Sequence, residues 1–298
     1  MTERQTLRFL TQRFEQVGLR PKTKFGQNFL IDMNLLDLIV RTAEIDEQDV
    51  VLEVGTGAGS LTTRMAPRAA HVVTIEIDKD LAELATHQLS NYDNVTILQI
   101  DALRNKNHLN DVLIEEVRKQ VARVPNGRLK LVANLPYNVA TPIISNLLNV
   151  TPWPSRMVVT IQKELAERMT AKPRTKDYSA LSFWIQSQCD CEIVRIMPPS
   201  VFWPRPKVDS AILLVKPSVE KRAKLSDPVY FHETVRALFL HRRKYLRSAL
   251  ISAMQDQMDK QAVDEILATA GYGAEKRAEE LSIDEMIALT ELCRKRQG

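Results

Sequence analysis

One stretch decides how the rest of the chain is interpreted: Val51-Leu-Glu-Val-Gly-Thr-Gly-Ala-Gly-Ser60. It begins as an apolar strand, interrupted only by Glu53, and ends in a glycine-rich turn. Gly55, Gly57 and Gly59 permit positive φ and allow a ligand to approach the backbone closely. The G-x-G-x-G spacing differs from the G-x-G-x-x-G fingerprint of dinucleotide binding, and no Lys-Ser/Thr pair follows to form a phosphate-binding loop. The stretch therefore predicts a cofactor turn within an α/β fold, and it disfavours an NAD-dependent dehydrogenase.

Strand-like and helix-like segments alternate on both sides of this turn. The predicted strands are residues 50–54, 71–77, 95–100, 129–133, 157–161, 192–197 and 211–215. Helical patterns such as 34–43, 79–89 and 111–121 separate most of them. This alternation predicts a mostly parallel sheet with helices on both faces.

The pattern changes after residue 216. Strand signals vanish, and helices are predicted at 230–258, 260–270 and 282–294. The stretch 217–228 is polar and contains two prolines, as is typical of a linker. We therefore predict an α/β domain of residues 1–217, including a basic N-terminal segment, and a small all-α domain of residues 218–298.

Acidic residues close the second and third predicted strands. Glu76 lies where a carboxylate can accept both hydroxyls of a ribose. Asp101 lies where a carboxylate can accept from the amino group of an adenine. Each alone is also compatible with a solvated carboxylate at a strand end. Together with the glycine turn, and without a nearby cationic pocket, they favour an adenosyl ligand that lacks phosphates, such as S-adenosylmethionine.

The fourth predicted strand ends in Leu131-Val-Ala-Asn-Leu-Pro-Tyr137. Pro136 cannot donate to a sheet, so the strand must stop near Asn134. Ligands of open α/β sheets bind at this end of the strands. Asn134 offers an amide acceptor, Pro136 a carbonyl and Tyr137 a flat ring, a set that suits the exocyclic amine of a flipped purine. The simpler interpretation is a strand followed by a proline turn.

A proline-rich loop, Pro198-Pro-Ser-Val-Phe-Trp-Pro204, supplies a second aromatic candidate. We expect Phe202 to form the other wall of a pocket for the target base, opposite Tyr137. The alternative is an aromatic side chain of the core.

Basic residues without acidic neighbours predict a surface for RNA. No Asp or Glu occurs between Thr234 and Gln255, and an uninterrupted helix there would place its arginines opposite an apolar face. Such a face favours phosphate contact over simple solvation. The residues predicted to contact RNA are Lys22, Lys24, Arg236, Arg243, Lys244 and Arg247.

The bulk composition of the 298 residues is that of an ordinary globular protein, with 44% apolar and 26% charged residues. No apolar run is long enough to cross a bilayer, and the first residues lack the apolar core of a signal peptide. The three cysteines fit no disulfide framework or metal spacing, and the five histidines are scattered. We expect a cytoplasmic monomer without a metal or a membrane partner.

The motifs, taken in order, resemble those of the ribosomal RNA adenine N6,N6-dimethyltransferase family. The matching segments are 24–30, 53–62, 75–78, 101–103, 134–138, 176–179, 198–202, 206–210 and 239–244. Two departures are Thr56 with Ala58 in the glycine turn and Leu240 with His241 in the last motif.

The resemblance implies a Rossmann-like, S-adenosylmethionine-dependent methyltransferase sheet. It implies that Asn28 and Leu30 hold the cofactor from the N-terminal side and that the pocket is lined by Gly55, Glu76, Asp101 and Asn134, beside Gly57 of the turn. The implied substrate is two adjacent adenosines in the 3′-terminal hairpin loop of small-subunit rRNA, within an assembling particle. The implied product is N6,N6-dimethyladenosine.

Two other functions remain open at this level. A DNA adenine N6-methyltransferase is the first, although its acceptor motif is usually Asp-Pro-Pro-Tyr and it needs a domain that reads sequence. A non-catalytic assembly or transcription factor on the same fold is the second. The non-catalytic alternative is disfavoured because the chain has all of the residues predicted for the cofactor and acceptor site, which are Glu76, Asp101, Asn134, Pro136 and Tyr137.

Overall fold

The computed structural model describes residues 7–16, 18, 20–22, 25–255 and 257–297. The chain forms two compact units. The first combines residues 1–166 with 192–216, and the second combines residues 167–191 with 217–298. Residues 167–191, which the predicted domain of residues 1–217 includes, therefore group with the C-terminal helices.

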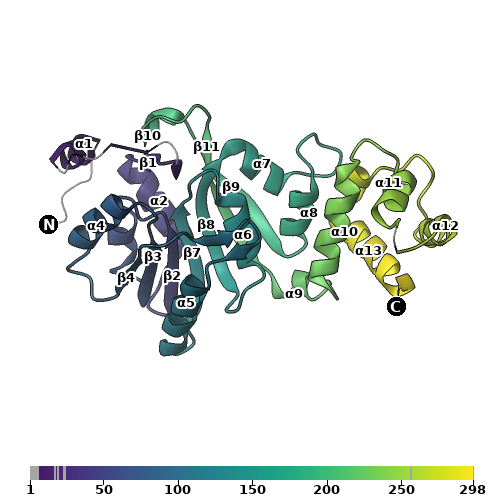
Figure 1. The fold of residues 1–298 in the computed structure, drawn as a ribbon, viewed down its shortest axis with the longest axis horizontal. Helices are drawn as coiled ribbons and strands as arrows, with labels where there is room; N and C mark the ends of the chain where they lie inside the picture. Colours follow the sequence, from purple (N-terminus) through teal and green to yellow (C-terminus); the bar gives the residue numbers. More distant parts are fainter. Residues whose placement is uncertain (1–6, 17, 19, 23–24, 256, 298) are drawn as a thin grey trace. The chain divides into compact units, whose positions relative to one another are not determined.

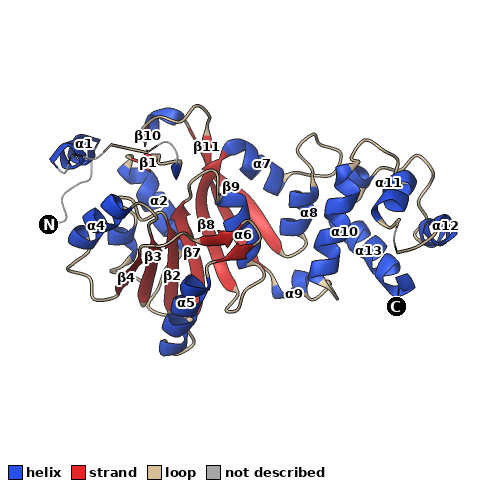
Figure 2. Cartoon of the chain, viewed as in Figure 1, coloured by secondary structure: helices blue, strands red, loops and turns tan. Residues whose placement is uncertain are grey.

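A seven-stranded sheet with the order β4-β3-β2-β7-β8-β11-β9 organises the first unit (Figures 1 and 2). The pairs β4-β3, β3-β2, β2-β7 and β7-β8 are parallel, whereas β11 runs antiparallel to β8. This confirms the predicted fold class and the seven predicted strands. Their bounds are β2 Asp49–Val54, β3 His71–Ile75, β4 Val95–Leu98, β7 Arg128–Asn134, β8 Pro154–Gln162, β9 Cys189–Met197 and β11 Ser210–Pro217.

Four short strands lie outside this sheet. The antiparallel pair β1 and β10 brings the N-terminal segment to the loop after β9, with Leu30 opposite Phe202. The antiparallel pair β5 and β6 follows β4 along the chain. Their bounds are β1 Phe29–Leu30, β5 Leu103–Asn105, β6 His108–Leu109 and β10 Phe202–Trp203.

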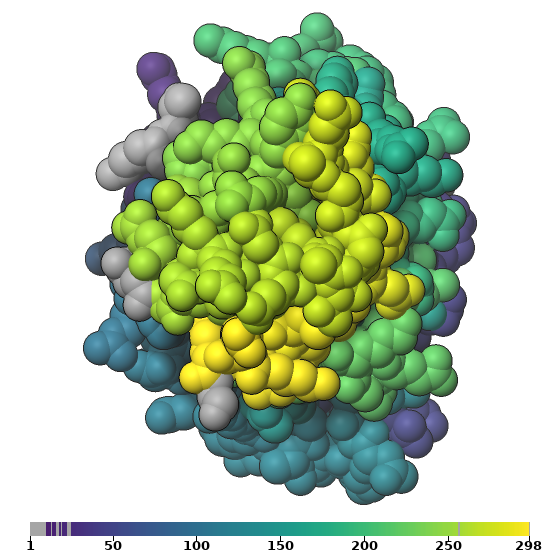
Figure 3. Space-filling view, turned by 90° about the vertical axis from the view of Figure 1, so that its right-hand side faces the viewer, coloured from purple at the N-terminus to yellow at the C-terminus, as the bar shows by residue number. Residues whose placement is uncertain are grey.

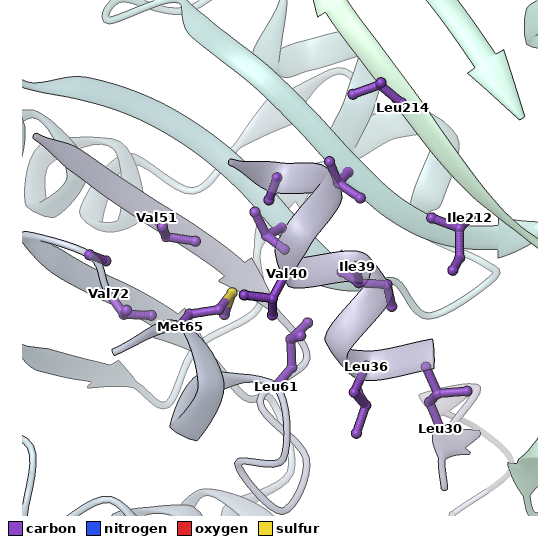
Figure 4. Packing of buried hydrophobic residues seen from close by; sticks show 14 of the residues in the cluster. Leu30, Leu36, Ile39, Val40, Val51, Leu61, Met65, Val72, Ile212 and Leu214 are labelled. Carbon is purple, nitrogen blue, oxygen red and sulfur yellow. The ribbon is translucent and has the colours of Figure 1, made fainter. Parts of the chain in front are cut away.

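Helices bury both faces of the sheet. All residues of β2 are buried, and successive side chains of a strand point to opposite faces, so both faces must be covered. On one face, α2 places Ile39 and Val40 among side chains of the sheet such as Val51, Val72 and Ile212 (Figure 4). Helix α5 packs against β2, β3 and β7. The helices that begin in this unit are α1 Leu7–Gln16, α2 Met33–Ala43, α3 Thr62–Met65, α4 Lys79–Gln88, α5 Asp111–Arg123, α6 Ala140–Leu147 and α7 Lys163–Thr170.

The second unit is helical. Its helices are α8 Ala180–Gln186, α9 Val219–Arg222, α10 Pro228–Leu240, α11 Leu246–Ala253, α12 Lys260–Thr269 and α13 Ile283–Gln297. Helix α10 packs against α8, α11 and α13. None of the helices in the described part of the chain is long and apolar enough to span a membrane.

The single helix predicted over 230–258 is wrong. The chain leaves the helix after Leu240, makes a turn, and begins α11 at Leu246, whose N–H donates to the carbonyl of Lys276 at 2.7 Å. Leu238 and Leu246 are both buried, and their separation of about two helical turns also suits an unbroken helix. No Pro or Gly marks the break in the sequence.

Candidate active site

The predicted cofactor and acceptor residues surround one cavity at the carboxyl ends of β2, β3 and β7. Strands β3 and β7 each pair with β2 in parallel, so the residues that follow the three strands meet at one edge of the sheet. The predicted residues that line the cavity are Asn28, Leu30, Gly55, Gly57, Glu76, Asp101, Asn134, Pro136 and Tyr137.

The glycine turn after β2 is fixed by hydrogen bonds to the end of β3. The N–H groups of Gly55 and Thr56 both donate to the carbonyl of Ile75, at 2.8 and 3.1 Å. Gly57 has φ of +55°, and a Cβ added there would lie 3.0 Å from the ring of Phe29. Only glycine therefore fits this position without strain or displacement of that ring.

Glu76 connects the turn to the strand end. Its Oε2 accepts from the N–H of Gly57 at 2.9 Å, and its Oε1 accepts from the N–H of Asp78 at 3.0 Å. The residue is 5% exposed, and burial raises the pKa of its carboxyl. Each carboxylate oxygen has a second lone pair, so the group retains capacity to accept from hydroxyls in the cavity.

Asp101 follows β4 and is exposed at the cavity rim. Its Oδ1 accepts from the N–H of Leu103 at 2.9 Å, and its backbone carbonyl accepts from Asn110 Nδ2 at 3.1 Å. These bonds fix the residue where the chain turns away from the sheet. The carboxylate keeps acceptor capacity for a donor in the cavity.

The side-chain amide of Asn134 has a defined orientation. Its Nδ2 donates to the backbone carbonyl of Asn28 at 2.8 Å. A carbonyl oxygen can only accept, so the NH₂ group must face it and Oδ1 must point the other way. Within the described residues, Oδ1 accepts no hydrogen bond. The residue therefore presents a free acceptor beside the cavity.

The backbone after Asn134 supplies a second acceptor. The N–H of Leu135 donates to Thr160 on β8 at 3.1 Å, and the Pro136 carbonyl accepts from the N–H of Val139 at 3.1 Å. The carbonyl of Leu135 accepts no hydrogen bond from the part of the chain that the structure describes. The Pro136 carbonyl, which the sequence offers as an acceptor, is thus already bonded, and the carbonyl of Leu135 is the better placed to accept from a ligand.

The two aromatic predictions have different outcomes. Tyr137 lines the cavity and is partly exposed there. Phe202 does not: it is 1% exposed, belongs to the apolar core around α2, and is held in β10 opposite Leu30. The prediction that Phe202 forms a pocket wall is corrected, because pairing of β1 with β10 directs this ring into the core.

The predicted RNA-binding residues are not equally available. Lys22 forms ion pairs with Asp78 and Asp80, both at 2.8 Å. Arg247 contacts both carboxylate oxygens of Asp264, at 2.5 and 2.8 Å. Lys24 lies outside the described residues.

Arg236, Arg243 and Lys244 are exposed and form no ion pair with any described residue. Because α10 ends at Leu240, Arg243 and Lys244 lie in the turn and do not share a helix face with Arg236. The prediction that Arg236, Arg243 and Arg247 share one face of a single helix is therefore wrong.

Sequence reasoning missed a buried hydrogen-bond network beneath the glycine turn. Glu53 Oε2 accepts from the hydroxyls of Thr62 at 2.5 Å and Thr74 at 2.7 Å, and Thr56 Oγ1 lies 2.7 Å from Thr74 Oγ1. Burial raises the pKa of Glu53 to about 8. The signal was a carboxylate within an apolar strand. The hydroxyl of Thr56, a departure from the family pattern, is thereby satisfied.

The charge of the cavity lining restricts the ligand. The acidic residues Glu76 and Asp101 line it, together with Glu53, whose carboxyl keeps its proton near pH 7, and the described lining contains no Lys or Arg. A phosphate-bearing cofactor would meet no cation here, whereas a positively charged one would be attracted. No group of His, Cys, Asp and Glu in the described residues is arranged to hold a metal ion.

Comparison with known proteins decides the family. The model of the ribosomal RNA adenine dimethylase family matches residues 18–295. The chain belongs to this family. Its relatives include the ribosomal RNA small subunit methyltransferase A of Clostridium acetobutylicum, with 38% identity over 277 residues, 93% of this chain and 95% of that protein. That of Listeria innocua is 40% identical over 281 residues, 94% of this chain and 93% of that protein.

Solved structures agree with this assignment. A dimethyladenosine transferase from Plasmodium falciparum has a TM-score of 0.73 and 25% identity, covering 87% of this chain and 94% of that one. The 23S rRNA methyltransferase ErmE has a TM-score of 0.63 and 25% identity, covering 89% and 99%. The predicted family and enzyme class, an rRNA adenine dimethyltransferase, are confirmed.

The Glu53 network generates a pH prediction. The folded protein holds a proton on Glu53 up to about pH 8, whereas the unfolded chain loses it near the ordinary value of 4.5. The unfolded state therefore binds fewer protons in this window, and stability contributed by Glu53 falls as pH rises through it, by roughly 1.4 kcal/mol per pH unit. We expect Glu53→Gln to remove this slope.

The measurement is the free energy of unfolding in urea at several pH values between 5 and 9, for the parent and the variant. The difference between the two proteins isolates Glu53 from other titrating groups. Parallel pH profiles would show that Glu53 is ionised in the folded state throughout the range.

Proposed function

We propose that this protein transfers methyl groups from S-adenosylmethionine to N6 of two adjacent adenosines in the 3′-terminal hairpin loop of small-subunit rRNA. The product is N6,N6-dimethyladenosine, and the substrate is an assembling small-subunit particle. The observation that carries the proposal is the fixed amide of Asn134, whose Oδ1 is free and which lines the same cavity as Leu135 in a chain of this family.

The cavity has the donors and acceptors that S-adenosylmethionine requires. Glu76 can accept from the ribose hydroxyls and Asp101 from the adenine amino group, as each carboxylate retains lone pairs. The glycine turn lets the ligand lie against the backbone, and the anionic lining matches its positive charge. When bound, this cofactor supplies an electrophilic methyl group on a sulfonium.

The residues around Asn134 address the weakness of the adenine nitrogen as a nucleophile. Its lone pair is delocalised into the ring, and the nitrogen carries two hydrogens. Asn134 Oδ1 and the Leu135 carbonyl are two acceptors for them, which favours a pyramidal nitrogen with its lone pair directed at the donor. Holding the reactants in line then supplies most of the rate, since no residue has to remove a proton beforehand.

The neutral amide is also compatible with a second transfer. After one methyl group is attached, the nitrogen retains a single N–H, and one of the two acceptors is enough to orient it. A carboxylate would bind that remaining hydrogen more tightly, because hydrogen bonds to charged acceptors are the stronger ones. An uncharged acceptor therefore discriminates less between a nitrogen that carries two hydrogens and a nitrogen that carries one.

Removal of this acceptor is the first test. We expect Asn134→Ala to lower the rate of methyl transfer to unmodified small ribosomal subunits by about 10² to 10³, the size found when one preorganised polar group is removed from an active site. Binding of S-adenosylmethionine, measured by calorimetry, should change far less. Asn146→Ala, at a partly exposed position of α6 outside the described cavity lining, is the matched control and should retain the parental rate.

The same assay with naked small-subunit rRNA and with duplex DNA separates the proposed substrate from its alternatives. Equal transfer to DNA would favour a DNA methyltransferase. Absence of transfer to every substrate by the parent protein would favour a non-catalytic factor. Retained activity in Asn134→Ala would contradict the role of the amide.

The exposed basic residues of the second unit are proposed to contact RNA phosphates. Arg243 and Lys244 lie in the turn between α10 and α11, and Arg236 lies on α10. Figure 3 shows the surface of this unit, where the yellow-green region after residue 225 lies beside the yellow of α13. Arg242 and Arg247, by contrast, are paired with Glu279 and Asp264.

This difference predicts unequal effects on RNA affinity. Each phosphate contact adds about one to the slope of log K against log salt, so Arg243→Ala and Lys244→Ala should each reduce that slope by about one. Arg247→Ala should change it less, since its charge is already neutralised by Asp264. Filter binding or anisotropy from 50 to 300 mM salt gives the slopes. Equal slopes for all variants would exclude this surface.

A further inference from the structure

One polar contact of the acceptor turn, residues 134–137, holds neither the cofactor nor the target amine. The hydroxyl of Tyr137 lies 2.6 Å from the hydroxyl of Ser210. Ser210 is the last residue of the motif Pro206-Lys-Val-Asp-Ser210. None of these five residues is in the described lining of the cavity. Ser210 itself is thus not among the described residues that line the cavity, and its side-chain link to the active site is the hydroxyl of Tyr137.

The sheet explains why these residues meet. Strand β8 is parallel to β7, so its final residue, Gln162, lies at the same edge of the sheet as Asn134. Strand β11 is antiparallel to β8, and Ser210, its first residue, is the partner of Gln162. The start of β11 is therefore placed at the edge where the acceptor turn begins, two strands away from β7.

Burial makes the contact specific. Ser210 is fully buried, and a buried hydroxyl without a hydrogen-bond partner destabilises the fold. The hydroxyl of Tyr137 is its only side-chain hydrogen-bond partner among the described residues. Burial also raises the pKa of the Tyr137 phenol, so this group stays neutral near pH 7 and can either donate to Ser210 or accept from it.

A fixed phenol end constrains the ring. A tyrosine ring at a cavity can otherwise move by changes in its side-chain torsions. The backbone holds one end of this side chain and Ser210 holds the phenol oxygen at the other, so the ring keeps one position at the cavity. Hydrogen bonds of a phenol oxygen also prefer the plane of its ring, which favours one orientation of the flat face. A flat face in a fixed position is what a base needs when it is held out of its stack.

We propose that Ser210 is a positioning residue for methyl transfer, because its hydrogen bond to Tyr137 holds in place the ring against which the target adenine stacks. This inference rests on the proposed function and deepens it. It predicts an effect on turnover and on the KM for the RNA substrate, and none on binding of S-adenosylmethionine.

The test is a double-mutant cycle with Ser210→Ala, Tyr137→Phe and the combined variant, assayed on unmodified small ribosomal subunits. Loss of a neutral hydrogen bond corresponds to about a tenfold change, so each single variant should lose about tenfold in kcat/KM. The combined variant should lose no more than either single one, because both substitutions remove the same bond. Ser210→Thr, which keeps the hydroxyl, should restore most of the activity.

Each outcome distinguishes the inference from a merely structural role. The fraction of folded protein is taken from the stoichiometry of S-adenosylmethionine binding in calorimetry, and kcat/KM is corrected for it. A loss of kcat/KM that vanishes after this correction overturns the proposal. Multiplicative losses in the combined variant, about 100-fold, also overturn it. If Ser210→Ala does not fold, Tyr137→Phe and Ser210→Thr decide: parental kcat/KM in Tyr137→Phe overturns the inference. Failure of the parent protein to methylate rRNA would instead reject the proposed function.

Discussion

The hydrogen bond from Asn134 Nδ2 to the backbone carbonyl of Asn28 is the constraint on which the active site depends. It joins the end of β7 to the N-terminal segment, although these residues are far apart in the sequence. It also decides which end of the amide faces the cavity, because the backbone carbonyl can only accept. An asparagine at a strand end could otherwise turn either way, and with the opposite orientation it would offer hydrogens to a nitrogen that already carries its own.

The remainder of the fold keeps the two partners of this bond in place. Pairing of β1 with β10 anchors the N-terminal segment immediately after Asn28. The side chain of Pro136 packs near Gly55, where an added Cβ would lie 3.5 Å from Pro136 Cδ. The cofactor turn, residues 55–59, and the acceptor turn, residues 134–137, are thus close neighbours. The central parallel strands supply a rigid base for both turns because both of their faces are buried.

Much of this arrangement is predictable from the sequence. The apolar periodicity locates all seven strands, and the residues that close β2, β3, β4 and β7 come together because parallel strands end at one edge. The apolar residues of the C-terminal segment are likewise buried as expected, for example Val235 and Leu250. Strand order and the pairing of side chains that are far apart in the sequence are not predictable from this periodicity.

The failures share a physical cause, since each depends on partners that are remote in the sequence. Phe202 has the sequence setting of a pocket wall, but pairing of β10 with β1 turns it into the core. The arginines of 234–255 have no acidic neighbour in sequence, yet Asp264 neutralises Arg247 across the fold. The break after Leu240 carries no Pro or Gly, because tertiary contacts such as Leu246 N–H to Lys276 set it.

The most direct test of the central claim is the methyl-transfer rate of Asn134→Asp on unmodified small ribosomal subunits near pH 7.5. Aspartate keeps an acceptor of the same shape but cannot donate to the carbonyl of Asn28, so its carboxylate would face that oxygen at the distance of the present hydrogen bond. If orientation of the amide is what the site requires, the rate should fall about as far as in Asn134→Ala, with cofactor binding largely retained. A rate close to that of the parent protein would contradict the account, because an acceptor alone would then be sufficient.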